Sequence, residues 1–105
     1  MKLMTKANRK ALPELYANEG KGFDAITPVK FFSPVTGWTW FITEFDGHDT
    51  LFGYCAGNIS EWGYTSLHEL ESADYRGMSV VERDLYWKPK TVKQALEGLG
   101  IVGVQ

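Results

Sequence analysis

The sequence is poor in the residues from which most catalytic and metal centres are built. It contains one cysteine, Cys55, and two histidines, His48 and His68. One cysteine cannot form an internal disulfide, and two histidines without metal-ligand spacing exclude a histidine-rich metal site. Phosphate-loop, dinucleotide-binding and serine-nucleophile patterns are also missing. We therefore predict no catalytic residue, no metal and no cofactor, and favour a protein that is not an enzyme.

Long apolar runs are missing as well. No stretch approaches the roughly 18 residues that a membrane span needs, and the opening MKLMTKANRK lacks the apolar block of a secretory signal. Together with the lone cysteine, these features predict a cytoplasmic protein. A length of 105 residues with 44% hydrophobic content supports one modest core, so we expect a single domain over residues 1–105.

Negative charge is concentrated in the middle of the chain. The formal net charge is −2, but residues 44–84 carry nine acidic and two basic residues, whereas both flanking segments are net positive. An acidic middle disfavours nucleic acid binding there and complements a partner protein with a basic surface. A solvated face that keeps the protein soluble explains the same charge.

The stretch GWTWFITEFDGHDTLFGYCAGN, residues 37–58, predicts a β-hairpin. Aromatic and β-branched residues fill 38–45 and 51–56, and Asp46-Gly47 between them favours a tight turn. The loop has either two residues, 46–47, or four, 46–49. Both registers leave the same residues sharing a face.

The remaining elements are short. We expect a helix after Thr5 that is interrupted at Pro13, and helices that begin after capping patterns at Ser66 and Thr91. Further strands are predicted at 29–32, 62–65 and 78–87, and the tail 101–105 as an edge segment or a frayed end. This order predicts an α+β fold: a single, mainly antiparallel sheet of about four to five strands, with two or three short helices packed mostly on one face.

The two faces of the hairpin differ. The first face is apolar and should meet the helices, with Gly53 leaving room beside a large ring: Trp38, Trp40, Ile42, Leu51 and Cys55. The second face keeps aromatic rings where a solvated face would be polar: Thr39, Phe41, Thr43, Phe45, Phe52 and Tyr54. Either another segment such as the C-terminal helix or a dimer partner covers these rings, or they form a contact patch.

Aromatic rings bordered by acids are typical of protein-binding surfaces. The candidate protein-binding residues are therefore four rings and four acids: Phe41, Phe45, Phe52, Tyr54, Glu44, Asp46, Asp49 and Glu61. We expect Arg83, beside Leu85 and Trp87 on one strand face, to stack on a ring or to pair with Glu44.

Two alternative functions would each use some of the candidate protein-binding residues. A metal-dependent hydrolase or nuclease would use Asp46, His48 and Asp49, with or without Glu44, although turn formation accounts for the same residue types. A single-strand nucleic-acid-binding accessory protein would stack bases on Phe41, Phe52 and Tyr54 beside the basic N-terminal helix. The neighbouring acids disfavour the second alternative.

Several blocks of the sequence resemble one protein family. The blocks LPELY, VKFFSPVTGWTWFITEFDG, FGYCAG, GYTSLHELES and VERDLYWKP span roughly residues 3–89. In this order they resemble a family of short uncharacterised proteins carried on plasmids, phages and conjugative elements, a domain of unknown function. The resemblance implies a mobile-element origin and supplies no catalytic residues. It implies roles such as disabling a host defence complex, as an anti-CRISPR does, or assisting replication and transfer of the element.

Overall fold

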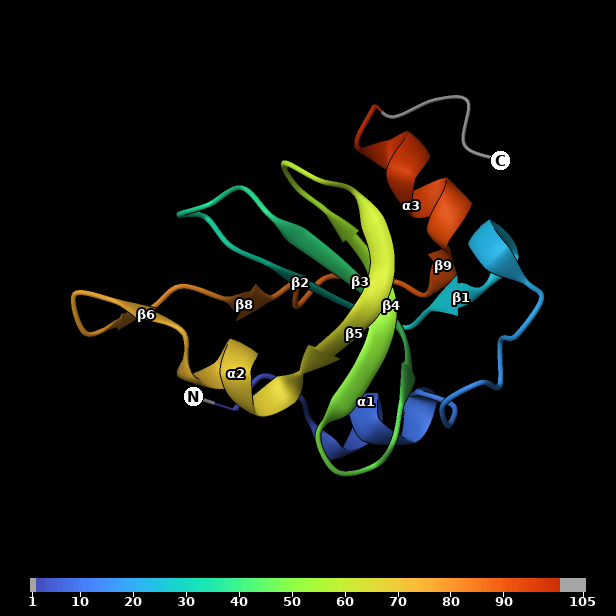
Figure 1. Ribbon diagram of the computed structural model, residues 1–105, viewed down its shortest axis with the longest axis horizontal. Helices are drawn as coiled ribbons and strands as arrows, with labels where there is room; N and C mark the ends of the chain where they lie inside the picture. Colours follow the sequence, from blue (N-terminus) through green and yellow to red (C-terminus); the bar gives the residue numbers. More distant parts are fainter. Residues whose placement is uncertain (1, 101–105) are drawn as a thin grey trace.

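A five-stranded antiparallel sheet forms the centre of the computed structural model, which describes residues 2–100 (Figure 1). The strand order is β5-β4-β3-β2-β8. Its members are β2 (Val29–Phe32), β3 (Thr39–Phe45), β4 (Thr50–Ala56), β5 (Glu61–Ser66) and β8 (Glu82–Arg83). Short helices accompany the sheet, which confirms the predicted α+β class and the mainly antiparallel pairing.

The other elements are α1 (Lys6–Ala11), the 3-10 helix η1 (Gly22–Asp24), α2 (Leu67–Ser72) and α3 (Val92–Gly98). Two small ribbons complete the described chain: β1 (Ile26–Thr27) with β9 (Lys90–Thr91), and β6 (Asp74–Tyr75) with β7 (Met78–Ser79). The β6–β7 hairpin projects from the sheet at the left of Figure 1. The predicted tail at 101–105 lies outside the described residues.

The helices begin where the capping patterns predicted. The side chains of Thr5, Ser66 and Thr91 each accept a hydrogen bond from the backbone N–H three residues later. Such caps satisfy N–H groups that have no partner within the helix. Helix α1 ends at Ala11, just before Pro13, because proline cannot continue the hydrogen-bonding pattern.

The predicted strand over 78–87 is wrong in its extent. Arg76 and Gly77 both have positive φ, of 54° and 79°, and turn the chain so that β7 pairs with β6. Only β8 joins the main sheet, through Phe31 and Phe32 of β2. Residues 80–81 belong to no strand and separate β7 from β8, and a turn at 85–86 follows β8, so the predicted strand is divided into two short pieces.

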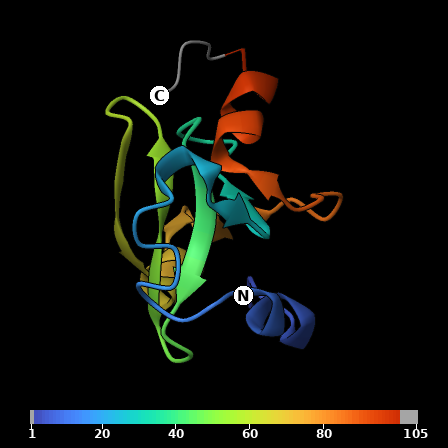
Figure 2. The same ribbon diagram turned by 90° about the vertical axis from the view of Figure 1, so that its right-hand side faces the viewer.

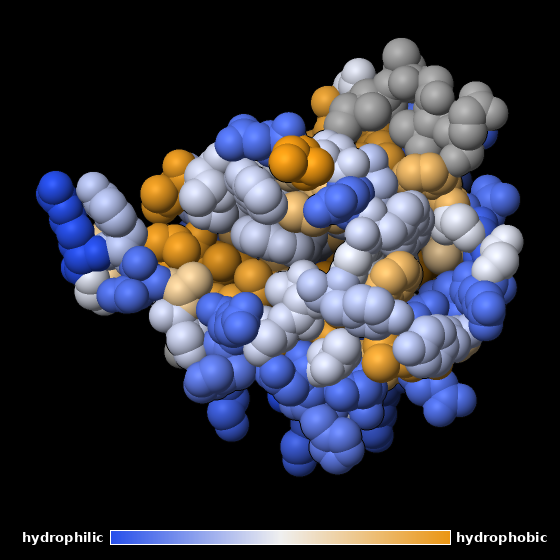
Figure 3. Space-filling model, in the orientation of Figure 1, coloured by the Kyte–Doolittle hydropathy of each residue, from blue (hydrophilic) through white to orange (hydrophobic). Residues whose placement is uncertain are grey.

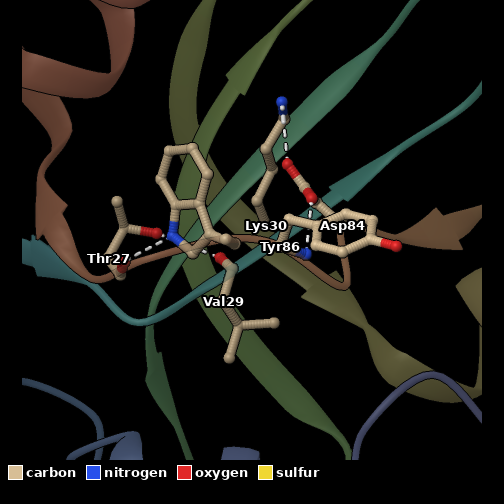
Figure 4. Close-up of polar contacts among 6 residues, drawn as sticks. Thr27, Val29, Lys30, Asp84 and Tyr86 are labelled. Atoms are coloured by element: carbon tan, nitrogen blue, oxygen red, sulfur yellow. Dashed lines mark hydrogen bonds and ion pairs between the residues drawn. The ribbon is translucent and has the colours of Figure 1, made fainter.

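Residues after β8 are fastened to the sheet by polar contacts (Figure 4). Lys30 Nζ lies 3.5 Å from Asp84 Oδ2, and the indole N–H of Trp87 donates to the Thr27 carbonyl at 2.9 Å.

Arg83, within β8, donates to the carbonyl oxygen of Leu3. The predicted pairing of Arg83 with Glu44 is therefore wrong.

Each face of the sheet carries its own buried cluster. On one face, sheet residues such as Phe31 and Ile42 pack against Leu67 and Leu70 of α2 and against residues flanking α1. On the other face, Phe41 packs with Ala56 and with three residues of α3: Val92, Ala95 and Leu96. Figure 1 also shows α2 and α3 at opposite ends of the sheet.

A β-bulge in β3 determines which residues share a face. Trp40 lies opposite Cys55 and Ile42 opposite Gly53, so these residues share a face as predicted, but the register then shifts between Ile42 and Glu44. The turn holds three residues, 47–49, because the N–H of Asp46 donates to the Thr50 carbonyl, so both predicted loops, 46–47 and 46–49, are wrong. The extra residue at Thr43 therefore puts Phe45 on the first face and Glu44 on the second, the reverse of the prediction.

Gly53 is required by the backbone of the neighbouring strand. A Cβ atom at this position would collide with the carbonyl oxygen of Phe41 and come within 2.9 Å of the Cα of Ile42. The predicted role, leaving room beside a large ring, is thus replaced by close approach of two main chains. Gly63, directly opposite on β5, has open space where its Cβ would be.

This pair of glycines gives a matched stability test. Gly53→Ala should lower the free energy of unfolding by roughly 1–3 kcal/mol, because the opposing backbone must move to admit a methyl group. Gly63→Ala should change it by less than about 0.5 kcal/mol. Urea unfolding followed by tryptophan fluorescence measures both. Equal destabilisation by the two substitutions would contradict the proposed backbone contact.

Candidate functional site

A cavity of about 290 Å³ lies between the segment 16–22 and the second face of β4 and β5. Figure 2 shows the segment between α1 and η1 running past these strands. Four rings and two carboxylates are among the residues that line it: Tyr16, Phe52, Trp62, Tyr64, Glu19 and Glu44. We call it the aromatic cavity.

The rings of the aromatic cavity are held by each other. Phe52 and Trp62 are stacked, with centroids 5.6 Å apart and 11° between their planes, and Phe52 also lies 5.0 Å from Tyr64. Behind them, Phe23 of η1 packs against Trp62 at 5.4 Å and against Tyr54 at 5.3 Å. Contacts of this kind fix ring orientations, so these walls of the cavity are formed before any ligand arrives.

Tyr16 and Tyr64 form the exposed side of the cavity, with 65% and 56% of their surfaces accessible. A side-chain hydrogen bond with Tyr16 raises the pKa of Tyr64, and partial desolvation and the charge of Glu44 act in the same direction. A tyrosine phenol is already protonated at neutral pH and the shift acts in the same direction, so Tyr64 presents an uncharged ring.

Glu44 is the buried acid of the aromatic cavity, with only 4% of its surface exposed. Its two carboxylate oxygens accept hydrogen bonds from the backbone N–H groups of Tyr16, at 2.7 Å, and Asn18, at 2.9 Å. The Asn18 amide in turn donates to the carbonyl of Thr43 at 3.1 Å. The bulge and its neighbour thus hold the segment 16–18 over the sheet.

No basic side chain neutralises Glu44 within residues 2–100, where the one ion pair formed by lysine or arginine joins Lys30 and Asp84. Hydrogen bonds from N–H groups stabilise a carboxylate but leave its net charge in place. The aromatic cavity therefore carries a buried negative charge.

Two predicted contact residues are wrong as surface residues. Phe41 is fully buried beneath α3, with its ring 5.7 Å from that of Trp87. Phe45 is 4% exposed on the opposite face because of the bulge, and the guanidinium of Arg9 covers its ring at 5.3 Å. The covering of Phe41 by the C-terminal helix is the alternative that the sequence had left open.

Phe52 and Tyr54 are half-buried, and Phe52 lines the aromatic cavity. Glu61 is exposed on β5 but shares a face with Cys55, where a different hollow of about 190 Å³ opens beside Trp40. The predicted residues are therefore distributed over both faces.

In the hydropathy view of Figure 3, apolar side chains show between the β6–β7 hairpin and the sheet.

Asp46 and Asp49 serve the backbone of the turn. Asp46 Oδ1 accepts from the N–H groups of His48, Asp49 and Thr50, and these bonds lower the pKa of Asp46. Asp49 accepts from the Ser66 hydroxyl at 2.6 Å and from the His68 N–H at 2.7 Å, which lowers the pKa of Asp49. No group of three His, Cys, Asp or Glu side chains suited to a metal ion occurs between residues 2 and 100.

Of the residues lining the cavity, only Glu44 and Phe52 belonged to the sequence-based site; those it missed include Tyr16, Asn18, Trp62 and Tyr64. The alternation in EWGYTS contained a usable signal for two of them, because Trp62 and Tyr64 lie opposite Tyr54 and Phe52. The positions of Tyr16 and Asn18 follow from hydrogen bonds to Glu44, which connect residues 26–28 positions apart.

Fold and site together define a small α+β protein with an aromatic cavity against an antiparallel sheet. The family model described as "Protein of unknown function (DUF2958)" matches residues 3–95, and the chain belongs to this family. The searches of curated proteins and of solved structures gave no match. Between residues 2 and 100, no helix has the length and apolar character needed to cross a membrane.

The contacts of Asp49 predict how stability depends on pH. Its pKa is lower in the folded state than in the unfolded chain, so its contribution is present above about pH 4 and is lost as the pH falls below that value. Asp49→Asn should lower the urea midpoint at pH 7 and lose less stability than the wild type between pH 5 and pH 3.

Urea titrations at several pH values, followed by tryptophan fluorescence, measure this difference. Glu97→Gln, at an exposed position of α3, is the control and should keep the wild-type pH dependence. A pH profile of Asp49→Asn parallel to that of the wild type would refute the assignment.

Proposed function

We propose that this chain is a non-enzymatic protein-binding factor that acts in the cytoplasm and engages a partner with a basic surface through the aromatic cavity. The observation that carries this proposal is the preformed cavity itself, which combines exposed rings with a buried carboxylate that no basic side chain of the described chain neutralises. Aromatic residues held in fixed orientations supply much of the binding energy at protein interfaces.

The location of the cavity supports a macromolecular partner. Strand β5, which provides Trp62 and Tyr64, is at the edge of the sheet. Its outer side has no neighbouring strand within the main sheet, so a partner segment can approach the rings along it. Glu19, which is exposed, lies beside the cavity and adds negative charge to its border.

The finer part of the proposal concerns the target. The resemblance to proteins of mobile elements and the acidic segment 44–84 favour a host defence complex, which this chain would inhibit as an anti-CRISPR or related factor. Proteins that handle nucleic acids present basic grooves, and an acidic binder competes for such a groove. Inhibition would then follow from occupation of the groove rather than from chemistry.

Affinity capture with matched variants tests the proposal. The tagged protein should retain a basic protein from a lysate of the host cell, and the captured protein should bind again when both components are purified. Raising the salt from about 0.1 to 0.5 M should weaken the complex, because the attraction between charged surfaces is screened.

Tyr64→Leu should reduce this binding roughly fivefold or more, since it removes an exposed ring of the cavity. Tyr86→Leu is the control, because Tyr86 is 91% exposed and does not line the cavity. Failure to capture a protein whose binding depends on Tyr64, or an equal effect of the two substitutions, would refute the proposed function.

A further inference from the structure

The aromatic cavity has the components of a cation-binding site. The faces of aromatic rings attract cations, and the attraction strengthens where water is excluded. Phe52, Trp62, Tyr64 and Tyr16 contribute rings to its lining. Glu44 adds a full negative charge, with almost none of its surface in contact with solvent.

Elsewhere, the chain places its own cations on its rings. Arg9 lies over Phe45 at 5.3 Å from the ring centroid, Arg76 over Tyr75 at 5.2 Å and Lys90 over Trp87 at 4.4 Å. No lysine or arginine of the described chain is among the residues that line the aromatic cavity. The cavity therefore combines several rings with an acid but lacks the cation found at these other rings.

Burial of a carboxylate without a cationic partner is costly, and the cost is reduced when a cation enters beside it. Each of the two oxygens of Glu44 accepts one hydrogen bond from a backbone N–H group. A carboxylate can accept further hydrogen bonds. An incoming guanidinium or ammonium group would supply both the hydrogen bonds and the opposite charge.

The volume of the cavity suits a small group. About 290 Å³ is at the lower end of the range of ligand pockets, which fits a side-chain head group rather than a large cofactor. We infer that the aromatic cavity binds the guanidinium or ammonium head group of a basic side chain, inserted between the rings and Glu44. The inference rests on the proposed function for the source of that side chain, whereas the cavity's chemistry can be tested without any partner.

The test uses the full chain labelled with ¹⁵N and N-acetyl-arginine amide as probe, with N-acetyl-lysine amide in parallel. N-acetyl-citrulline amide is the neutral control, since it has nearly the same shape as the arginine derivative without its charge. The amide signals of Asn18, Gly20 and Gly22 and the indole signal of Trp62 report binding at the cavity. At least one cationic probe should shift these signals saturably, and citrulline should bind roughly tenfold more weakly.

Two substitutions at one position separate the role of the ring from that of its hydroxyl. Tyr64→Phe keeps the ring and should retain binding within about threefold, whereas Tyr64→Leu should weaken it by a further factor of roughly three or more. Tyr86→Leu should behave as the wild type. Equal binding of citrulline and arginine, no saturable shift up to about 100 mM probe, or unchanged binding by Tyr64→Leu would overturn the inference.

The outcomes also separate this inference from the proposed function. If the cationic probes bind but no partner protein is retained, the cation site stands and the proposed function fails. If a partner binds through Tyr64 while the probes do not, the proposed function stands and the cation site is refuted.

Discussion

The bulge at Thr43 is the constraint on which the second face of the sheet depends. By inserting one residue into β3, it turns Glu44 toward Phe52 and sends Phe45 into the opposite core. The bulge is itself satisfied, because the Thr43 hydroxyl donates to the Phe52 carbonyl at 3.1 Å and its own carbonyl accepts from Asn18. A regular strand would have put Phe45 beside the cavity and Glu44 in an apolar core. The hydrogen bonds of Thr43, the placement of the Phe45 ring and the position of the buried Glu44 carboxylate thus all follow from one extra residue.

Much of the acidity of the middle segment serves the main chain. Asp46 and Asp49 organise the β3–β4 turn and its connection to α2, and Glu44 holds the segment 16–18. Glu71 accepts from the N–H of Leu3 at 2.8 Å and thereby connects α2 to the N-terminal residues. These hydrogen bonds leave the carboxylate charges in place, but they occupy oxygen positions that a partner would otherwise contact. A buried carboxylate inside a cavity acts over a short distance and selects what enters, whereas exposed carboxylates act mainly on the rate of encounter.

The fold was more predictable from sequence than the site, and the difference has a physical basis. Strands, helix starts and the break before Pro13 are set by local preferences, so Val29–Phe32 and the caps at Thr5 and Thr91 were found directly. The aromatic second face was also recognised, because alternation within a strand is local. The bulge depends on contacts with Asn18, far away in the chain, and nothing in TWFITEF marks Thr43 as the extra residue. One unrecognised insertion then exchanged the faces of Glu44 and Phe45, which were both among the predicted protein-binding residues.

The two buried clusters are built on the same strands, since β3 gives Ile42 to one and Phe41 to the other, while β4 gives Leu51 and Ala56. Adjacent residues of a single strand therefore support layers on opposite sides. Neither layer can lose its packing without removing the backing of the other, so melting should proceed as one all-or-none transition despite the separate cores. A protein of this size gains from that arrangement the cooperativity that neither small core would provide alone.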